Sequence, residues 1–193
     1  MHNPVVFGHS WSTLVAIAVA LHKHYAIQGL VLASGNYFPT VRFDVWMMSG
    51  PAVPVLGDLL RYTVAPIISW AALPSIFRRI FAPRSVPSVF KNEFPTGLML
   101  RPKQLRAAAE ESGLLIPATA QLQSQYSDIK CPVRIFHGTE DQVIEPAQSQ
   151  RLHDVLEDSV LRLVQDSGHM VTYAEPHGID QAIAALNRSQ RVA

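Results

Sequence analysis

The 193-residue sequence has few of the features that mark several common protein classes. Its single cysteine, Cys131, cannot form an internal disulfide, which excludes a disulfide-stabilised scaffold. Charged residues make up only 16%, and the formal net charge is +1. A charge this close to zero provides no electrostatic footprint for nucleic acid or an anionic membrane surface, so we expect neither as a partner.

Several sequence motifs are absent as well. There is no P-loop, no glycine-rich dinucleotide fingerprint and no internal repeat. The 8 histidines include no pair whose spacing from a carboxylate or cysteine suits metal ligands, so we expect no metal site.

No membrane span or targeting segment is evident. No apolar run reaches the ~18–20 residues of a membrane-spanning helix, because charged residues and prolines interrupt the most apolar stretch, residues 53–81. The chain begins without a signal peptide, which makes the cytoplasm the default expectation. A true N-terminus lying upstream would carry any targeting segment with it.

What the sequence does contain is an alternation of strand-like and helix-like segments. Hydrophobic residues make up 48%, enough for one globular domain with a sizeable core. Strand alternating with helix favours an α/β fold with a parallel sheet. The predicted strands are residues 4–7, 29–35, 132–136 and 160–164, and the predicted helices among them are residues 12–21 and 146–156.

The most informative segment is Gly8-His9-Ser10-Trp11-Ser12, between the first strand and the first helix. A serine at a sharp strand-to-helix turn presents its hydroxyl outside the backbone. It also lies at the positive end of a helix, which stabilises an oxyanion. The pattern resembles the G-x-S-x-G nucleophile elbow of the α/β-hydrolases, except that Ser12 replaces the last glycine. The bland alternative is a serine capping an ordinary helix.

Two later loops strengthen this resemblance. The strand at 132–136 leads into His137-Gly138-Thr139-Glu140-Asp141, and the strand at 160–164 leads into Asp166-Ser167-Gly168-His169. The α/β-hydrolases carry their triad in the order serine, acid, histidine, on loops of this kind. The resemblance therefore implies Ser10 as nucleophile, His169 as base and Asp141 as acid. It also implies that the backbone N–H of Trp11 supplies part of the oxyanion hole, and it implies no cofactor.

Rivals to two of these residues remain open. Glu140 and Glu145 lie close to Asp141, and Asp44 follows the preceding strand, where some relatives place the acid. His9 precedes the nucleophile and suits a structural role better than that of a base. The remaining histidines suggest no function: His2, His22, His24, His137, His153 and His177.

Residues 37–128 interrupt the strand–helix alternation and resemble the helical cap that many α/β-hydrolases insert at this point. The core would then comprise residues 1–36 and 129–193. Residues 55–68, 71–81 and 102–112 are the helical candidates within the cap. A minority of its apolar side chains are expected to line a pocket above Ser10, from the set Met47, Met48, Leu59, Ile67, Trp70 and Phe77. Its basic cluster is expected to be a solvated face, formed by Arg78, Arg79 and Arg84.

In the α/β-hydrolases the elbow follows the fifth strand of eight, so the chain resembles an N-terminally truncated member. The first strand is then expected to be an exposed edge. The family's second oxyanion donor would lie in the missing part. We expect a small-molecule ester or related acyl bond as substrate. Haloalkane dehalogenases and epoxide hydrolases resemble this architecture but use an aspartate nucleophile, so the serine at the elbow argues against those two activities. The alternatives are an inactive remnant or binding module, and a receptor-like hydrolase with slow turnover.

Overall fold

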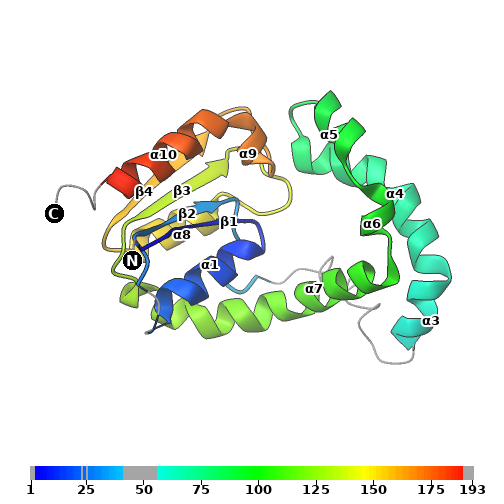
Figure 1. The fold of residues 1–193 in the computed structure, drawn as a ribbon, viewed down its shortest axis with the longest axis horizontal. Helices are drawn as coiled ribbons and strands as arrows, with labels where there is room; N and C mark the ends of the chain where they lie inside the picture. The colour runs from blue at the N-terminus through cyan, green and yellow to red at the C-terminus, as the bar shows by residue number, and fades with distance from the viewer. Residues whose placement is uncertain (1–2, 23, 25, 41–55, 189–193) are drawn as a thin grey trace.

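The computed structural model describes residues 3–22, 24, 26–40 and 56–188. At its centre is a four-stranded parallel sheet in the order β1-β2-β3-β4 (Figure 1). The predicted α/β fold class is confirmed, and each predicted strand is present. Their bounds are Val5–His9 for β1, Gly29–Ala33 for β2, Val133–Gly138 for β3 and Ser159–Val164 for β4.

Helices pack on both faces of this sheet and enclose two apolar clusters. On one face, α1 (Ser12–Leu21) and α8 (Ala147–Val155) pack against the sheet around Leu30, Leu32 and Ile135. On the other face, α9 (Val171–Ala174) and α10 (Pro176–Arg188) pack around Val31, Ala33 and Phe136. Strand β2 is buried along its whole length, which explains its continuous apolar sequence rather than an alternating one.

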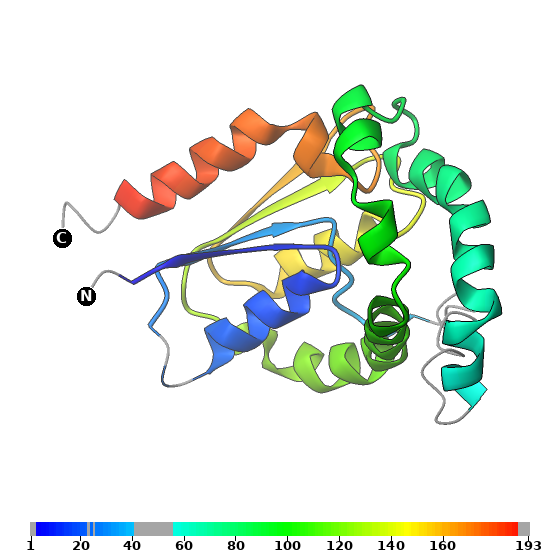
Figure 2. The ribbon, with the colours of Figure 1, turned by 45° about the vertical axis from the view of Figure 1, so that its right-hand side comes forward.

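A helical arm lies beyond the carboxyl ends of the strands (Figure 2). The two ends of the segment that forms this arm pack into the core, since Tyr37, Phe38 and Tyr126 belong to the cluster beneath α1 and α8. The arm comprises α3 (Leu56–Tyr62), α4 (Val64–Phe81), α5 (Ser88–Glu93), α6 (Thr96–Met99), α7 (Pro102–Leu122) and the 3-10 helix η2 (Gln123–Asp128).

The helix boundaries in this arm differ from those predicted. The break between the first two helices falls at Thr63, whose backbone leaves the helical region, rather than near residue 70. Helix α7 continues ten residues past the predicted end at Ser112. It runs through Pro117 although a proline inside a helix removes one helical hydrogen bond, and Leu115 and Thr119 on either side of that proline are buried.

Strand β1 is an edge strand in the described sheet, as predicted. Phe7 on this strand is 43% exposed, and Val15 on the adjoining helix α1 is 49% exposed. Apolar side chains of this size therefore face solvent beside a row of unpaired backbone groups.

Helix α4 has 18 residues and, by length and composition alone, is long and apolar enough to cross a membrane. Only 11% of it is buried in the structure. The prolines and charged residues within residues 53–81 therefore do not prevent this helix from being as long and as apolar as a membrane-spanning helix. A single helix of this kind is weak evidence for a span.

Candidate active site

Ser10 occupies a strained turn between β1 and α1. Its φ angle is 55°, in the left-handed region that residues other than glycine rarely adopt. Two backbone bonds hold this conformation: the Ser10 N–H donates to Ala33 O at 2.8 Å, and Thr13 N–H donates to Ser10 O at 3.1 Å. The fold imposes this strain at the residue predicted to be the nucleophile.

The residues on either side of Ser10 explain how the turn tolerates Ser12. The Ser12 hydroxyl accepts from His9 N–H at 2.9 Å and donates to His9 O at 2.8 Å, so the serine closes the turn itself. Gly8 has no such freedom. A Cβ there would lie 2.8 Å from Ser12 O and from Thr13 Cα, closer than backbone atoms allow.

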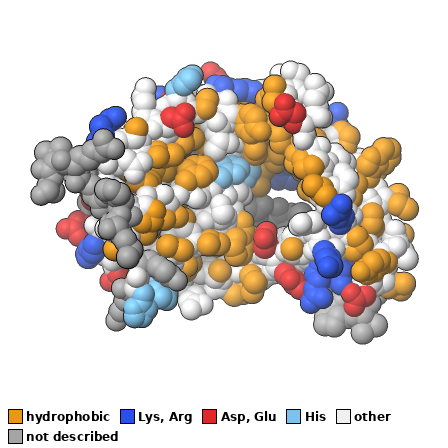
Figure 3. Space-filling view, viewed as in Figure 1, with side chains coloured by type: hydrophobic (Ala, Val, Ile, Leu, Met, Phe, Trp, Pro, Cys, Tyr) orange, Lys and Arg blue, Asp and Glu red, His pale blue; other side chains and the backbone are white. Residues whose placement is uncertain are grey.

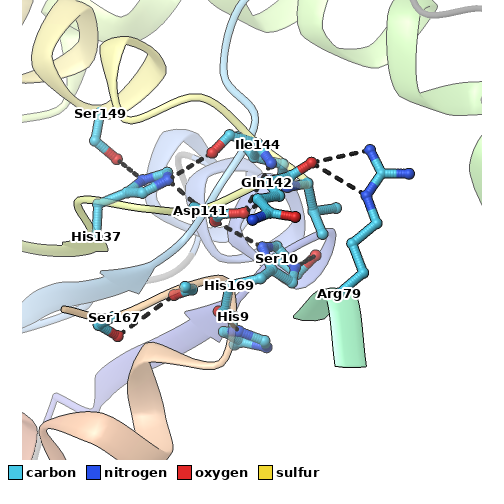
Figure 4. A network of polar contacts seen from close by, with 12 residues as sticks. His9, Ser10, Arg79, His137, Asp141, Gln142, Ile144, Ser149, Ser167 and His169 are labelled. Atoms are coloured by element: carbon cyan, nitrogen blue, oxygen red, sulfur yellow. Dashed lines mark hydrogen bonds and ion pairs between the residues drawn. The ribbon is translucent and has the colours of Figure 1, made fainter. Parts of the chain in front are cut away.

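The structure brings Ser10, Asp141 and His169 into one hydrogen-bonded chain (Figure 4). Nε2 of His169 lies 2.9 Å from the Ser10 hydroxyl, and Nδ1 of His169 lies 2.8 Å from Oδ2 of Asp141. Both the acid and the imidazole are buried, whereas Ser10 is partly exposed. A base oriented by a carboxylate and touching a hydroxyl is the arrangement that activates a nucleophile.

The carboxylate of Asp141 is held by four donors. Oδ1 accepts from the N–H groups of Val143 at 2.8 Å and Ile144 at 2.9 Å, while Oδ2 lies between His169 and His137. Burial alone would raise the pKa of this carboxyl. The bonds from His137 and His169 outweigh it and hold the pKa well below its usual range. Asp141 is therefore a fixed, ionised acceptor.

The structure separates Asp141 from its rivals. Glu140 and Glu145 are exposed, and among the described residues the carboxylate bonded to His169 is that of Asp141. Asp44 lies outside the described residues.

Two histidines to which the sequence assigned little or no role border the triad. Nε2 of His9 lies 3.0 Å from the backbone carbonyl of His169, and burial lowers the pKa of His9. A neutral His9 can donate this bond and so fix the loop that carries His169. His137 is completely buried and contacts Asp141 directly. Neither contact could be inferred from spacing along the chain.

Trp11 connects the elbow to the helical arm. Its indole Nε1–H donates to Glu111 O in α7 at 2.7 Å, and its ring packs with Leu14 and Leu115. Its backbone N–H lies at the amino end of α1, where the first amides have no acceptor within the helix. That amide is the predicted oxyanion donor.

Two arginines of the basic cluster do more than face solvent. The guanidinium of Arg79 donates to Gln142 O, next to Asp141, at 2.9 and 3.3 Å. Nε of Arg84 donates to Asp166 O, on the loop before His169, at 2.8 Å. A backbone hydrogen bond also connects the His169 loop to α4, because Met170 N–H donates to Ile80 O at 3.1 Å. The C-terminal end of α4 and the turn that follows it, at Arg84, therefore bind both loops that carry Asp141 and His169.

The face drawn in Figure 3 is hollowed between the core and the arm, with apolar side chains gathered around the hollow. A groove of about 510 Å³ between α4 and α6 includes two predicted pocket residues, Trp70 and Phe77. Leu59 and Ile67 are largely exposed on the arm, and Met47 and Met48 lie outside the described residues. Within the described chain, no group of three or more potential ligands could hold a metal ion.

Comparison with known proteins shows the family and the fold of this chain. A family model described as "Alpha/beta hydrolase family" matches residues 1–182. The chain belongs to this family. A search of curated proteins gives no match.

Solved structures of other α/β-hydrolases share the fold. MGS-M2, an α/β-hydrolase enzyme from a Medee basin deep-sea metagenome library, is 16% identical with a TM-score of 0.71, and the match covers 95% of this chain and 64% of that one. A thermophilic esterase from Thermogutta terrifontis is 18% identical with a TM-score of 0.62, covering 97% and 65%. Haloalkane dehalogenase DbeA from Bradyrhizobium elkani is 16% identical with a TM-score of 0.63, covering 97% and 69%. This α/β-hydrolase therefore spans about two thirds of the length of these relatives.

Proposed function

We propose that this α/β-hydrolase cleaves an ester or related acyl bond of a small molecule through a covalent acyl-serine intermediate. The observation that carries the proposal is the unbroken chain of hydrogen bonds from Ser10 through His169 to Asp141. The esterase and the dehalogenase among its structural neighbours support hydrolysis in general. A serine at position 10 favours acyl chemistry, since a hydroxyl activated by an adjacent base adds to a carbonyl carbon.

In this mechanism the Ser10 oxygen adds to the substrate carbonyl while Nε2 of His169 accepts the hydroxyl proton. Asp141 fixes the imidazole tautomer and stabilises the imidazolium that forms. The Trp11 N–H donates to the oxyanion, a contribution that typically changes the rate by about 10²–10³ per donor. His169 then protonates the leaving group, and the acyl-serine forms. Water, deprotonated by His169, adds to the acyl carbon and releases the acid with Ser10 restored.

Labelling by a fluorophosphonate probe, together with turnover of a short-chain p-nitrophenyl ester, tests this proposal. We expect labelling and turnover by the full chain, and loss of both in Ser10→Ala and in His169→Ala. The exposed-site variant His177→Ala serves as the histidine control and should behave like the unsubstituted chain. A folded chain that neither labels nor turns over ester would contradict the proposal and favour the binding-module alternative.

A further inference from the structure

His137 is a buried titratable group that the mechanism above leaves unused. It lies at the end of β3, four residues before Asp141, and its side chain is 0% exposed. A buried imidazole without partners would be costly, so each of its ring nitrogens needs a partner. Each ring nitrogen has a partner, and the partners differ in kind: a hydroxyl lies against Nδ1, whereas groups that only accept lie against Nε2 (Figure 4).

The partners of Nε2 determine where the proton sits. Nε2 lies 3.0 Å from Ile144 O and 3.2 Å from Oδ2 of Asp141. A backbone carbonyl and an ionised carboxylate only accept, so Nε2 must carry a hydrogen that they share. Nδ1 lies 2.6 Å from the Ser149 hydroxyl, which can donate to it. The neutral Nε2–H tautomer therefore satisfies every group in this cluster.

We infer that His137, oriented by Ser149, is a positioning residue that fixes the Asp141 carboxylate for His169. This inference rests on the proposed function for its catalytic meaning, but the contact itself is independent of activity. The same oxygen, Oδ2, accepts from His137 and from Nδ1 of His169. Because His137 is anchored to β3 and α8, it sets the position of Oδ2 from the side opposite His169.

Sharing Oδ2 also affects the charge on Asp141. Each donor favours the ionised form of a carboxyl, and the His137 bond is among the causes that lower the pKa of Asp141. Other titratable groups nearby are His9, which bonds the His169 carbonyl from β1, and Tyr37, whose hydroxyl lies near that of Ser149. From α4, the charged Arg79 side chain bonds Gln142 O. Among the described residues, none of these groups bonds the Asp141 carboxylate, whose partners are the N–H groups of Val143 and Ile144 and the two imidazoles.

The first test uses nuclear magnetic resonance on the full chain and needs no turnover. With ¹⁵N-labelled histidine, we expect His137 to carry its proton on Nε2 and none on Nδ1 at neutral pH. With ¹³C-labelled aspartate, we expect the midpoint of the Asp141 carboxyl titration to rise by about one pH unit in His137→Leu. His137→Gln, which restores an N–H near Nε2, should return most of this shift.

The chain provides a matched control. His153 makes a similar contact, with Nδ1 2.6 Å from the Ser159 hydroxyl, but is not bonded to the triad. We expect His153→Leu to leave the Asp141 titration unchanged. Should His137→Leu fail to fold, Ser149→Ala provides the variant that still tests the relay, with a smaller shift in the same direction.

Probe labelling then measures the consequence for the proposed chemistry. We expect His137→Leu to slow labelling at pH 7 about tenfold. His137→Gln should recover most of the lost rate, and His153→Leu should label at the rate of the unsubstituted chain. An unprotonated Nε2 on His137, or an Asp141 titration that His137→Leu does not move, would overturn the inference. An unsubstituted chain that resists labelling while showing both resonance results would contradict the proposed function alone.

Discussion

At the scale of single residues, the site depends on the Asp141 carboxylate, which is buried and ionised and has hydrogen-bond donors on both of its oxygens. Oδ1 of Asp141 accepts two backbone N–H groups, and Oδ2 lies between two imidazoles. An amide could keep the two backbone bonds but would turn an N–H₂ group toward two other donors. We therefore expect Asp141 to contribute to stability as well as to the proposed chemistry.

We predict that Asp141→Asn lowers the free energy of unfolding at pH 7, on the order of 1–3 kcal/mol. The folded-state pKa of Asp141 lies below its unfolded value of about 3.9, so this stability is present above that pH and is lost as the pH falls toward the folded value. The gap between the two proteins should therefore narrow below about pH 4. Urea unfolding from pH 7 to pH 3 measures this, and a gap that stays constant would contradict it.

The matched control is Glu140→Gln, which removes an exposed carboxylate from the same turn. Its unfolding curve should differ little from that of the unsubstituted chain at each pH, because a solvated carboxylate contributes little to the free energy of unfolding.

The sequence was enough to predict the three residues of this hydrogen-bonded chain, because each follows a strand in a recognisable loop. It could not predict the contacts of His137 or His9. These depend on how close β1, β3 and the loop before α9 come to one another, which the packing of the sheet decides. The small spacing between His137 and Asp141 carries no signal by itself, since four residues across a strand end and a turn have no fixed geometry.

At the scale of elements, the elbow requires β1 and α1 to approach closely. We predict that Gly8→Ala destabilises the chain by about 1–3 kcal/mol, since the added Cβ meets backbone atoms of Ser12 and Thr13 that cannot move independently. Thermal or urea unfolding measures the change. Gly97→Ala in α6 is the control, because nothing lies within 4 Å of its added Cβ. Equal effects at both positions would refute the packing argument.

The hydrogen bonds from the end of α4 and the turn after it to the two loops give a second prediction at this scale. Removing the guanidinium in Arg79→Ala or Arg84→Ala should slow probe labelling by up to about tenfold, because each frees a loop next to a triad residue. The effect is limited because both side chains are exposed. Arg78→Ala should label at the original rate, because within the described part of the chain the Arg78 side chain makes no hydrogen bond to either loop. If Arg79→Ala and Arg84→Ala label at the same rate as Arg78→Ala, the core alone positions the two loops.

Strands were easier to predict than arm helices for a physical reason. β2 and β3 are buried in the centre of the sheet, and their apolar runs reflect that burial directly. The arm is held by fewer buried side chains, so prolines and apolar residues there gave misleading boundaries. Pro117 lies within α7, and the break between α3 and α4 occurs at Thr63, a residue with no strong breaking tendency.

At the scale of the whole molecule, β1 forms the edge of the described sheet, with no described strand on its outer side. Phe7 and Val15 expose apolar surface there. We predict that the chain self-associates through this edge and that Phe7→Lys reduces the effect, because charged residues on an edge oppose strand pairing. Light scattering across a concentration series measures the mean mass. A mass that rises equally in both proteins would place the association elsewhere.

The central claim is that Ser10 is a nucleophile activated by His169 and Asp141. Mass spectrometry of the fluorophosphonate-treated chain tests it most directly, because it identifies the modified peptide. We expect a single adduct on the peptide that contains Ser10, formed in the unsubstituted chain and absent in His169→Ala. An adduct on another residue, or a folded chain with none, would contradict the claim.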